Sequence, residues 1–202
     1  RDPAGHFARC AHALHQAGDV SPVGGCRQPL GQSALVLLAC NDPALEVGRH
    51  IGPGADAAAE TRRGQLQLEA DAGKLPLTKQ SSDTVPGEGN PDAKIIFIGE
   101  AAGYHESVAR RPFVGLAGKL LNKCLDEINL KREQVYITNI LKTRPPDNRD
   151  PEPAEIAAYA PYLDAEIDII KPKIIATLGR FSMGKFLPEV KISQVHGQPR
   201  WV

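Results

Sequence analysis

Several features that would identify a class of protein are scarce or missing in this sequence. The 24 basic and 24 acidic residues cancel to a formal net charge of zero, so composition alone does not indicate a nucleic-acid partner. The four cysteines include no CxxC pair, which gives no ground for a zinc site or a disulfide framework. The apolar run at 34–40 is far too short to span a bilayer, and no basic segment precedes it. We therefore expect a reduced, cytoplasmic protein that is not attached to a membrane.

Composition changes abruptly about one third of the way along the chain. Residues 1–73 contain six arginines, no lysine and eight acidic residues, whereas residues 74–202 contain eleven lysines. A single isoleucine, Ile51, precedes residue 74, and the first part shows no sustained periodicity. We expect residues 1–71 to be a largely irregular extension, disordered or foreign to the native protein, and dispensable for folding. A genuine small domain is the alternative. Because the chain begins at Arg1 and not at Met, we also expect it to be a fragment.

From residue 94 onward the hydrophobic pattern becomes regular. Short, continuous apolar runs over 94–98, 135–139 and 173–178 predict buried strands. Between them, apolar residues recur at helical spacing over 116–128 and 156–170. A further helix through Phe181 and Phe186 is expected after the third run. This alternation of strands and helices predicts an α/β domain with a central parallel sheet and helices on both of its faces.

Ligands of such sheets bind outside the carboxyl ends of the strands. Three segments arrive at that edge, namely 99–103, Asn139 and 178–180. Gly99 and Gly103 allow the backbone of the first segment to turn tightly and approach a ligand closely. The same segment lacks the GxxxxGK[ST] pattern, which disfavours nucleoside triphosphates. The functional residues are therefore expected in these three segments.

Asn139 is the most informative residue at this edge. A side-chain amide presents a donor beside an acceptor, which matches the N3–H and carbonyl oxygen of uracil, whereas cytosine presents the reverse pattern. The alternative is a loop asparagine that caps the following turn. Lys142, Arg144 and Arg149 follow on a proline-containing loop, where they are expected to contact the DNA backbone. A solvated surface loop is the alternative for these three cations.

Five motifs occur in order along the second part of the chain: VPGEGN at 85–90, GEAAG at 99–103, RPFVGLAG at 111–118, YITN at 136–139 and RPPDNRDP at 144–151. Together they closely resemble the family-four (iron–sulfur type) uracil-DNA glycosylases of bacteria and archaea. The resemblance covers about residues 72–202. It implies a uracil-DNA glycosylase-like three-layer domain that is monomeric at full length and acts on uracil-containing DNA. Such enzymes flip the nucleotide out of the helix and hydrolyse the N-glycosidic bond of uracil.

The resemblance also assigns roles to individual residues. Phe113 would stack on the flipped uracil, Asn139 would read its edge, and Glu106 would help to exclude thymine. Ala101 occupies a position where a related family has a water-orienting Asp, so fixed hydrogen bonds to the leaving uracil anion would carry more of the catalysis. The catalytic residues implied are Glu100, Glu106 and Asn139. The residues implied to contact the base are Glu100, Ala101, Ala102, Phe113 and Asn139.

The sequence departs from the family pattern at the positions that hold the iron–sulfur cluster. The family has four cysteine ligands, and the matching positions here are Ala72, Leu75, Thr143 and Ala160. None of them offers the thiolate that such a cluster needs. We therefore expect a cluster-free branch of the family with no metal and no other cofactor.

A second departure concerns histidine. The family's other motif carries a His after the fourth strand, and that part would lie beyond Val202. His196 comes too early to be this residue and is interpreted as a loop histidine, so the chain is expected to be truncated and weakly active. The alternative function is a catalytically degenerate nucleic-acid-binding module with the same fold. The enzyme is favoured because a binding module does not need to keep a pocket that reads a base, and the residues retained together are Glu100, Glu106, Phe113 and Asn139.

Overall fold

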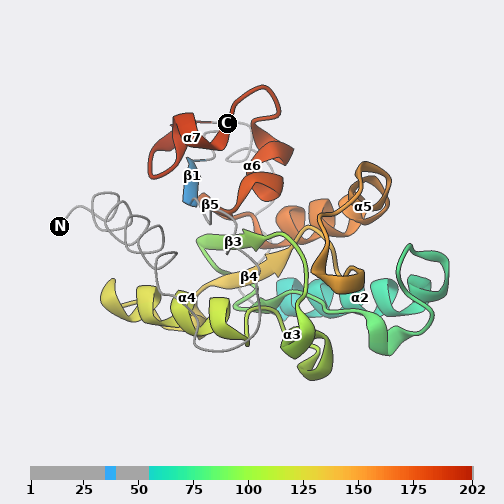
Figure 1. Cartoon of the computed structure of the whole chain (residues 1–202). Helices are drawn as coiled ribbons and strands as arrows, with labels where there is room; N and C mark the ends of the chain where they lie inside the picture. Colours follow the sequence, from blue (N-terminus) through green and yellow to red (C-terminus); the bar gives the residue numbers. More distant parts are fainter. Residues whose placement is uncertain (1–34, 40–54, 202) are drawn as a thin grey trace.

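A computed structural model describes residues 35–39 and 55–201 of the chain. The strands of this part form one six-stranded sheet in the order β2-β4-β3-β5-β1-β6 (Figure 1). Their bounds are β1 Leu35–Ala39, β2 Glu88–Gly89, β3 Ile95–Gly99, β4 Tyr136–Asn139, β5 Ile174–Leu178 and β6 Pro199–Trp201. The central trio β4-β3-β5 is parallel, and these are the three strands that the apolar runs predict. The predicted central parallel sheet is therefore confirmed, and antiparallel strands flank it, because β2 pairs with β4 and β1 pairs with β5 in that direction.

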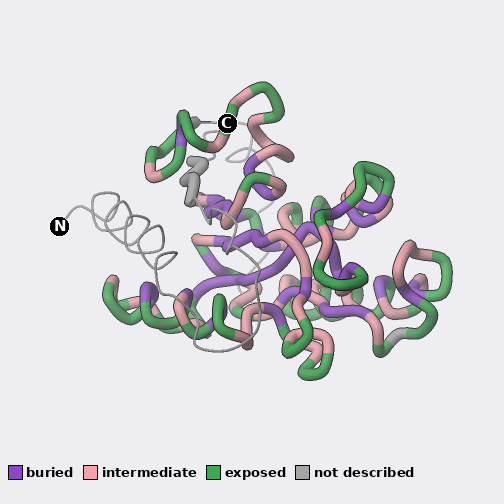
Figure 2. The backbone as a smooth tube through the Cα atoms, viewed as in Figure 1, coloured by how far each residue is buried: buried purple, intermediate pink, exposed green. Residues whose placement is uncertain are grey.

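Helices cover both faces of the parallel strands, as predicted. Successive side chains of a strand point to opposite faces. Ile96 and Ile98 of β3 pack in one cluster with residues of α5, α6 and α7, whereas Phe97 packs on the other face with Leu121 and Leu125 of α4. Buried residues accordingly follow the central strands in Figure 2. The helices concerned are α4 Leu116–Glu127, α5 Pro153–Ile170, α6 Arg180–Phe186 and α7 Ile192–Val195.

Helix α2 (Ala55–Asp71) differs from the sequence prediction. It packs against α5, and its Leu68 is buried in a cluster with Leu141 and Tyr159. Tyr162 of α5 donates a hydrogen bond of 2.9 Å to Asp71 at the end of α2. The expected irregular extension up to residue 71 is therefore wrong for 55–71, where the helix carries too few apolar residues to show a clear periodicity. Strand β1 also falls within that extension, and the remainder of the prediction, at 1–34 and 40–54, lies outside the described residues.

Short helical turns join these elements and shape the edge where the strands end. The loop after β3 contains a helix that the sequence did not predict, α3 (Tyr104–Ala109). Turns of 3-10 helix lie at η3 Ala72–Lys74, η4 Ser81–Asp83, η5 Arg132–Gln134 and η6 Pro146–Asn148. Within the part of the chain that the structure describes, no helix is long and apolar enough to cross a membrane.

Candidate active site

The carboxyl ends of β3 and β4 lie side by side, as the topology predicts. Gly99 and Asn139 are register partners in the parallel pair. The pairing continues past the strands, because the Ile140 amide donates to the Gly99 carbonyl at 3.1 Å and the Leu141 amide to the Glu100 carbonyl at 2.9 Å. These backbone bonds fix the segment that carries Glu100 beside the one that carries Asn139.

The side-chain amide of Asn139 holds an unsatisfied acceptor. The residue is 2% exposed, and its Oδ1 atom is buried without a hydrogen-bond partner. A Cβ atom placed on Gly99 would lie less than 3.0 Å from this oxygen and from the ring of Phe113, so the amide and the ring converge on the bare backbone of Gly99. A buried acceptor without a donor is costly and therefore rare in folded proteins. The arrangement suits a ligand that brings an N–H group to Asn139.

Glu106 shapes the loop that presents Phe113. Its Oε1 atom accepts hydrogen bonds from the amides of Val114 at 2.9 Å and Gly115 at 2.7 Å. Gly115 is the N-cap residue directly before α4, so the carboxylate also satisfies amides at the positive end of that helix. The structure gives Glu106 this loop-shaping contact, and its expected contact with the base stays a prediction.

Glu100 is a half-buried carboxylate beside an ion pair. Burial raises the pKa of Glu100 above its ordinary value, the charge of Asp150 raises it further, and Arg180 opposes both. Arg180, at the start of α6, pairs with Asp150. The sequence placed Arg180 at the correct edge of the sheet but assigned it no role. The ion pair thus forms a charged rim close to Glu100.

The two alanines after Glu100 are less available than the sequence suggests. Ala101 packs against the cluster of Leu68, Leu141 and Tyr159. Ala102 is buried, and its amide donates to the Thr143 carbonyl at 3.4 Å. The backbone N–H of Ala102 is thus already used within the chain, and the expected contact of Ala101 and Ala102 with the base stays a prediction.

The three cations expected on the DNA backbone have different environments. Lys142 is 0% exposed, and its Nζ atom contacts Glu166 and Thr138, so a contact with DNA phosphate is wrong for this residue. Burial lowers the pKa of Lys142, and the charge of Glu166 opposes that shift. Arg149 makes two hydrogen bonds, of 2.9 and 2.6 Å, to the carboxylate of Glu155. Arg144 lies at the surface edge of the loop, 5.4 Å from the ring centroid of Tyr104.

The four positions that match cluster ligands hold residues that cannot bind iron and that make other contacts in the fold. Leu75 packs against the cluster of Leu68, Leu141 and Tyr159, which fills this region with apolar atoms. The hydroxyl of Thr143 donates to the Asp83 carbonyl at 2.9 Å. Ala72 is buried at the start of η3, and Ala160 lies within α5. Across 35–39 and 55–201, no group of three or more His, Cys, Asp or Glu could hold a metal ion. The residues at these positions do not fit an iron–sulfur cluster.

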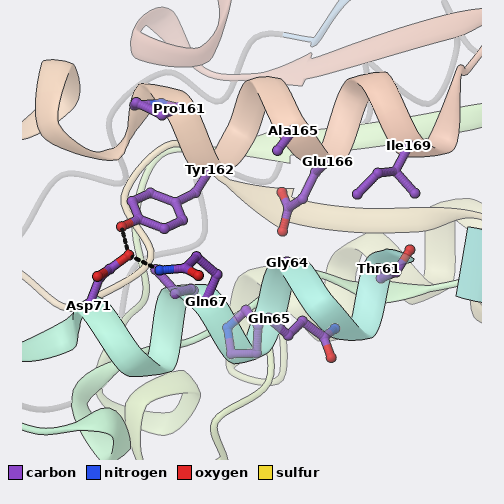
Figure 3. Close-up of a pocket in the computed structure, with 12 residues that line it drawn as sticks. Thr61, Gly64, Gln65, Gln67, Asp71, Pro161, Tyr162, Ala165, Glu166 and Ile169 are labelled. Atoms are coloured by element: carbon purple, nitrogen blue, oxygen red, sulfur yellow. Dashed lines mark hydrogen bonds between the residues drawn. The ribbon is translucent and has the colours of Figure 1, made fainter. Parts of the chain in front are cut away.

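A cavity of about 290 Å³ lies between α2 and α5 (Figure 3). Polar groups on its wall already bond to one another, since Asp71 accepts hydrogen bonds from Gln67 at 2.6 Å and from Tyr162 at 2.9 Å. Ile169 and Ala165 of α5 supply apolar wall. The cavity contains none of the expected site residues, so it is not the candidate active site.

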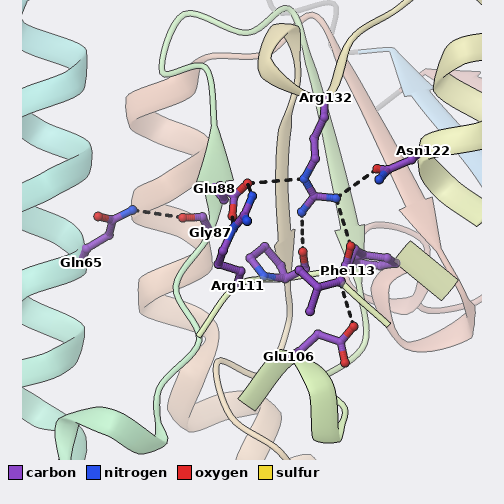
Figure 4. A network of polar contacts seen from close by, with 10 residues as sticks. Gln65, Gly87, Glu88, Glu106, Arg111, Phe113, Asn122 and Arg132 are labelled. Atoms are coloured by element: carbon purple, nitrogen blue, oxygen red, sulfur yellow. Dashed lines mark hydrogen bonds and ion pairs between the residues drawn. The ribbon is translucent and has the colours of Figure 1, made fainter. Parts of the chain in front are cut away.

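Arg132 is a residue near the site that sequence reasoning missed. Its guanidinium donates to the Phe113 carbonyl at 3.0 Å and pairs with Glu88 at 3.4 Å (Figure 4). No local pattern marks it, because it acts on backbone carbonyls that are distant in the sequence. Only the packing of η5 against the loop before α4 brings these groups together.

Comparison with known proteins identifies relatives of this chain by sequence. The chain is 58% identical over 110 residues to the type-4 uracil-DNA glycosylase of Sulfurisphaera tokodaii, covering 54% of this chain and 50% of the relative. It is 45% identical over 126 residues to the type-4 uracil-DNA glycosylase of Thermotoga maritima, covering 61% of this chain and 66% of the relative. A type-5 uracil-DNA glycosylase from Thermus thermophilus is 32% identical over 118 residues, covering 51% of this chain and 53% of the relative.

The chain thus spans between half and two thirds of the length of these curated relatives. The family model described as the uracil DNA glycosylase superfamily matches residues 86–201. This range contains β3, β4 and the loops that carry Glu100, Phe113 and Asn139. With more than half of its residues in that match, and with the unpaired amide of Asn139 at the end of β4, this chain belongs to the uracil DNA glycosylase superfamily.

Proposed function

We propose that this chain carries the base-reading site of a uracil-DNA glycosylase, which removes uracil from DNA by hydrolysing its N-glycosidic bond. The observation that carries the proposal is the buried Oδ1 atom of Asn139, which has no hydrogen-bond partner. The N3–H group of uracil would supply the missing donor, and the Asn139 amide group would donate to the neighbouring uracil carbonyl. Cytosine offers an acceptor at N3, so it would leave Oδ1 facing another lone pair.

The ring of Phe113 supports the same proposal. It lies beside Gly99 and Asn139, at the place where a flipped base could stack on an aromatic face. Base–aromatic stacking contributes about 1–3 kcal/mol per base. The base must leave the helix first, because its glycosidic bond is out of reach in the stack. Phe113 and Asn139 would then hold the plane and the edge of the same ring.

Catalysis would depend on charge developing on the leaving uracil. As the glycosidic bond breaks, the sugar becomes cationic and the base anionic, so a hydrogen bond from the Asn139 amide group to a uracil carbonyl would strengthen. The Glu100 carboxylate is half-buried at the same edge, and in this proposal it would favour a cationic sugar or orient water. We propose that Arg144 contributes to holding the DNA backbone from the rim, where its cationic side chain is not buried.

We infer that this domain functions without an iron–sulfur cluster. Such a cluster requires thiolates, and the cysteine that the structure describes, Cys124, is buried in α4, a helix that contains none of the four ligand positions. Leu75 and its apolar neighbours would instead hold the segment between α2 and β2 against α5. The test is anaerobic purification followed by iron analysis and a visible spectrum. Stoichiometric iron with thiolate-to-iron absorption would overturn this inference.

A degenerate nucleic-acid-binding module is the second candidate function. The occupied Ala102 amide favours it, because this backbone donor already bonds to the Thr143 carbonyl and is not free for a base. The unpaired Asn139 oxygen favours the enzyme, since a module that binds only the DNA backbone has no use for a buried, unsatisfied acceptor. Release of uracil from a uracil-containing single strand separates the two candidates.

The decisive experiment is the substitution Asn139→Asp. It replaces the donor by a second acceptor, which would repel the uracil carbonyl and should cost about 2–4 kcal/mol of transition-state stabilisation, as for one oxyanion donor. Binding of DNA without uracil should stay unchanged and provides the matched control. Uracil release that stays within a few-fold of the parent chain would show that Asn139 is only a turn residue.

A further inference from the structure

Phe113 has a backbone conformation that needs outside support. Its φ angle is 54°, in the left-handed region that residues with a Cβ atom rarely adopt. The residue nevertheless lies at the point where a ring must face the end of β3 and β4. A Cβ atom on Gly118 would collide with the Phe113 carbonyl, so the first turn of α4 also packs directly against this peptide. The ring direction therefore depends on a strained backbone that is held from several sides.

Arg132 bonds to the peptide groups on both sides of the Phe113 Cα atom. Its guanidinium donates to the carbonyls of Pro112 and Phe113, the latter at 3.0 Å. The same group reaches Asn122 of α4 at 3.3 Å and Glu88 of β2 at 3.4 Å (Figure 4). Its side chain is 14% exposed, so little water competes for these bonds. One planar cation thus ties the loop to α4 and to β2.

Glu106 holds the carboxyl-terminal side of the same segment. It accepts hydrogen bonds from the amides of Val114 and Gly115. The peptide group between Phe113 and Val114 thus has its carbonyl facing a cation and its amide facing an anion. The two side chains come from opposite sides of the loop, as Figure 4 shows. Together they bond to peptide groups on both sides of the Phe113 Cα atom, which leaves its φ and ψ little freedom.

We propose that Arg132 is a positioning residue, which keeps Phe113 in its left-handed conformation so that the ring faces Asn139 and can stack on the base. This proposal rests on the proposed function and deepens it. Arg132 itself is bonded to backbone carbonyls, Asn122 and Glu88, so it acts on the base only through Phe113. The role requires a planar fork of donors, which arginine has and lysine lacks.

The test compares two arginines that share Glu88. Arg111 makes bonds of 2.6 and 2.7 Å to Glu88, is more exposed, and has no bond to the Phe113 carbonyl among the contacts of the described residues. Arg111→Ala therefore removes an ion pair of Glu88 without releasing the turn. Arg132→Lys keeps a positive charge opposite Glu88 but cannot span both carbonyls. Arg132→Ala removes both the positive charge and the bonds to the two carbonyls.

The first measurement is independent of activity. In the full chain labelled for NMR, the three-bond HN–Hα coupling and the Cα shift of Phe113 report its φ angle. The parent chain and Arg111→Ala should show the left-handed value, and Arg132→Lys should show a shift toward negative φ. An unchanged φ angle in both Arg132 variants would overturn the proposal, whether or not the protein removes uracil.

The second measurement is the kinetics of uracil release. Stacking holds the base equally before and during the reaction, so its loss should raise KM with kcat nearly unchanged. We expect KM to rise about tenfold in Arg132→Lys, the lower part of what one base stack contributes, and to stay constant in Arg111→Ala. A role in stability alone would lower the active fraction, and hence the apparent kcat, at constant KM, which would overturn the proposal. If the parent chain releases no uracil, the proposed function fails, and the NMR comparison still decides the role of Arg132.

Discussion

Gly99 and Asn139 are register partners across β3 and β4, and a side chain on Gly99 would occupy the space beside the unpaired Asn139 oxygen. The candidate site thus depends on a residue that contributes no side chain. The backbone there has no unusual φ angle to accommodate, so the requirement for glycine comes from space alone. This makes the position sensitive to a single methyl group.

We predict that Gly99→Ala abolishes most uracil release. The added methyl group would press on both the Asn139 amide and the Phe113 ring, and displacement of aligned groups by about 1 Å can cost about a hundredfold in rate. Gly184→Ala in α6 is the matched control, because a Cβ atom there meets nothing within 4 Å. It should leave activity unchanged. Full activity of Gly99→Ala in a uracil-release assay would contradict the assigned site.

A second prediction concerns the pH dependence of stability at Glu100. Burial raises the pKa of this carboxyl in the folded chain, so ionised Glu100 weakens the fold at neutral pH. As the pH falls through the raised pKa, the folded state takes up a proton before the unfolded state does, and this destabilisation is relieved. Glu100→Gln should therefore melt higher than the parent chain at pH 7. The difference in melting temperature should shrink on acidification. It should stay small below the pKa of a glutamate in the unfolded chain, about 4.3.

Thermal unfolding of both proteins at a series of pH values between 7 and 4 measures this effect. The same variant should release uracil more slowly, because the role proposed for Glu100 requires a carboxylate. Such functional groups are often retained at a cost in stability. A difference in melting temperature that does not change with pH would show that Glu100 has an ordinary pKa in the folded chain.

The parallel strands could be predicted from the sequence because their apolar runs are continuous and two of them end at glycine. Asn139 could be placed at the sheet edge for the same reason. The buried state of Lys142 could not, because its partner Glu166 lies 24 residues away on α5 and only the folded chain brings them together. Similarly, Arg132 bonds to main-chain carbonyls, and main-chain acceptors leave no trace in a sequence pattern.

Helix α2 escaped prediction for a different physical reason. Most of its residues are Ala, Glu, Gln or Arg, which favour a helix without producing a strong apolar face. Its contact with the domain depends on few apolar residues, chiefly Leu68. Composition therefore gave the impression of an unstructured extension, although the helix packs along α5.

We predict that α2 contributes to the stability of the domain. Leu68 is buried whereas Leu66, two residues earlier, is largely exposed. Leu68→Ala should lower the free energy of unfolding by about 2–5 kcal/mol, as for other buried leucines. Leu66→Ala is the control and should change it by less than about 0.5 kcal/mol. Urea unfolding of both variants makes the comparison, and equal stability would restore the view that this segment is dispensable.

The last prediction separates the role of Lys142 from that of Arg144 on the loop after β4. Lys142 is buried against Glu166, whereas Arg144 lies at the rim beside Tyr104. Each phosphate contact adds about 0.7 to the salt dependence of single-strand binding. Arg144→Gln should therefore reduce the slope of log K against log salt by about that amount for a single strand without uracil. Lys142→Met should leave the slope unchanged.

The effects of these two substitutions on the free energy of unfolding should be in the opposite order, with the larger effect at Lys142. Lys142→Met leaves the largely buried carboxylate of Glu166 without its cation, which should cost about 3–5 kcal/mol. Replacing both members of such a pair by apolar residues often recovers most of that loss. The double variant Lys142→Met with Glu166→Leu is thus expected to be more stable than the single variant, and it allows DNA binding to be measured on a folded protein. Fluorescence anisotropy over a range of salt concentrations gives the slopes. A lower slope in the double variant, with Arg144→Gln unchanged, would mean that Lys142 leaves its buried site to contact DNA, because no other group is altered on the DNA-facing side of the loop.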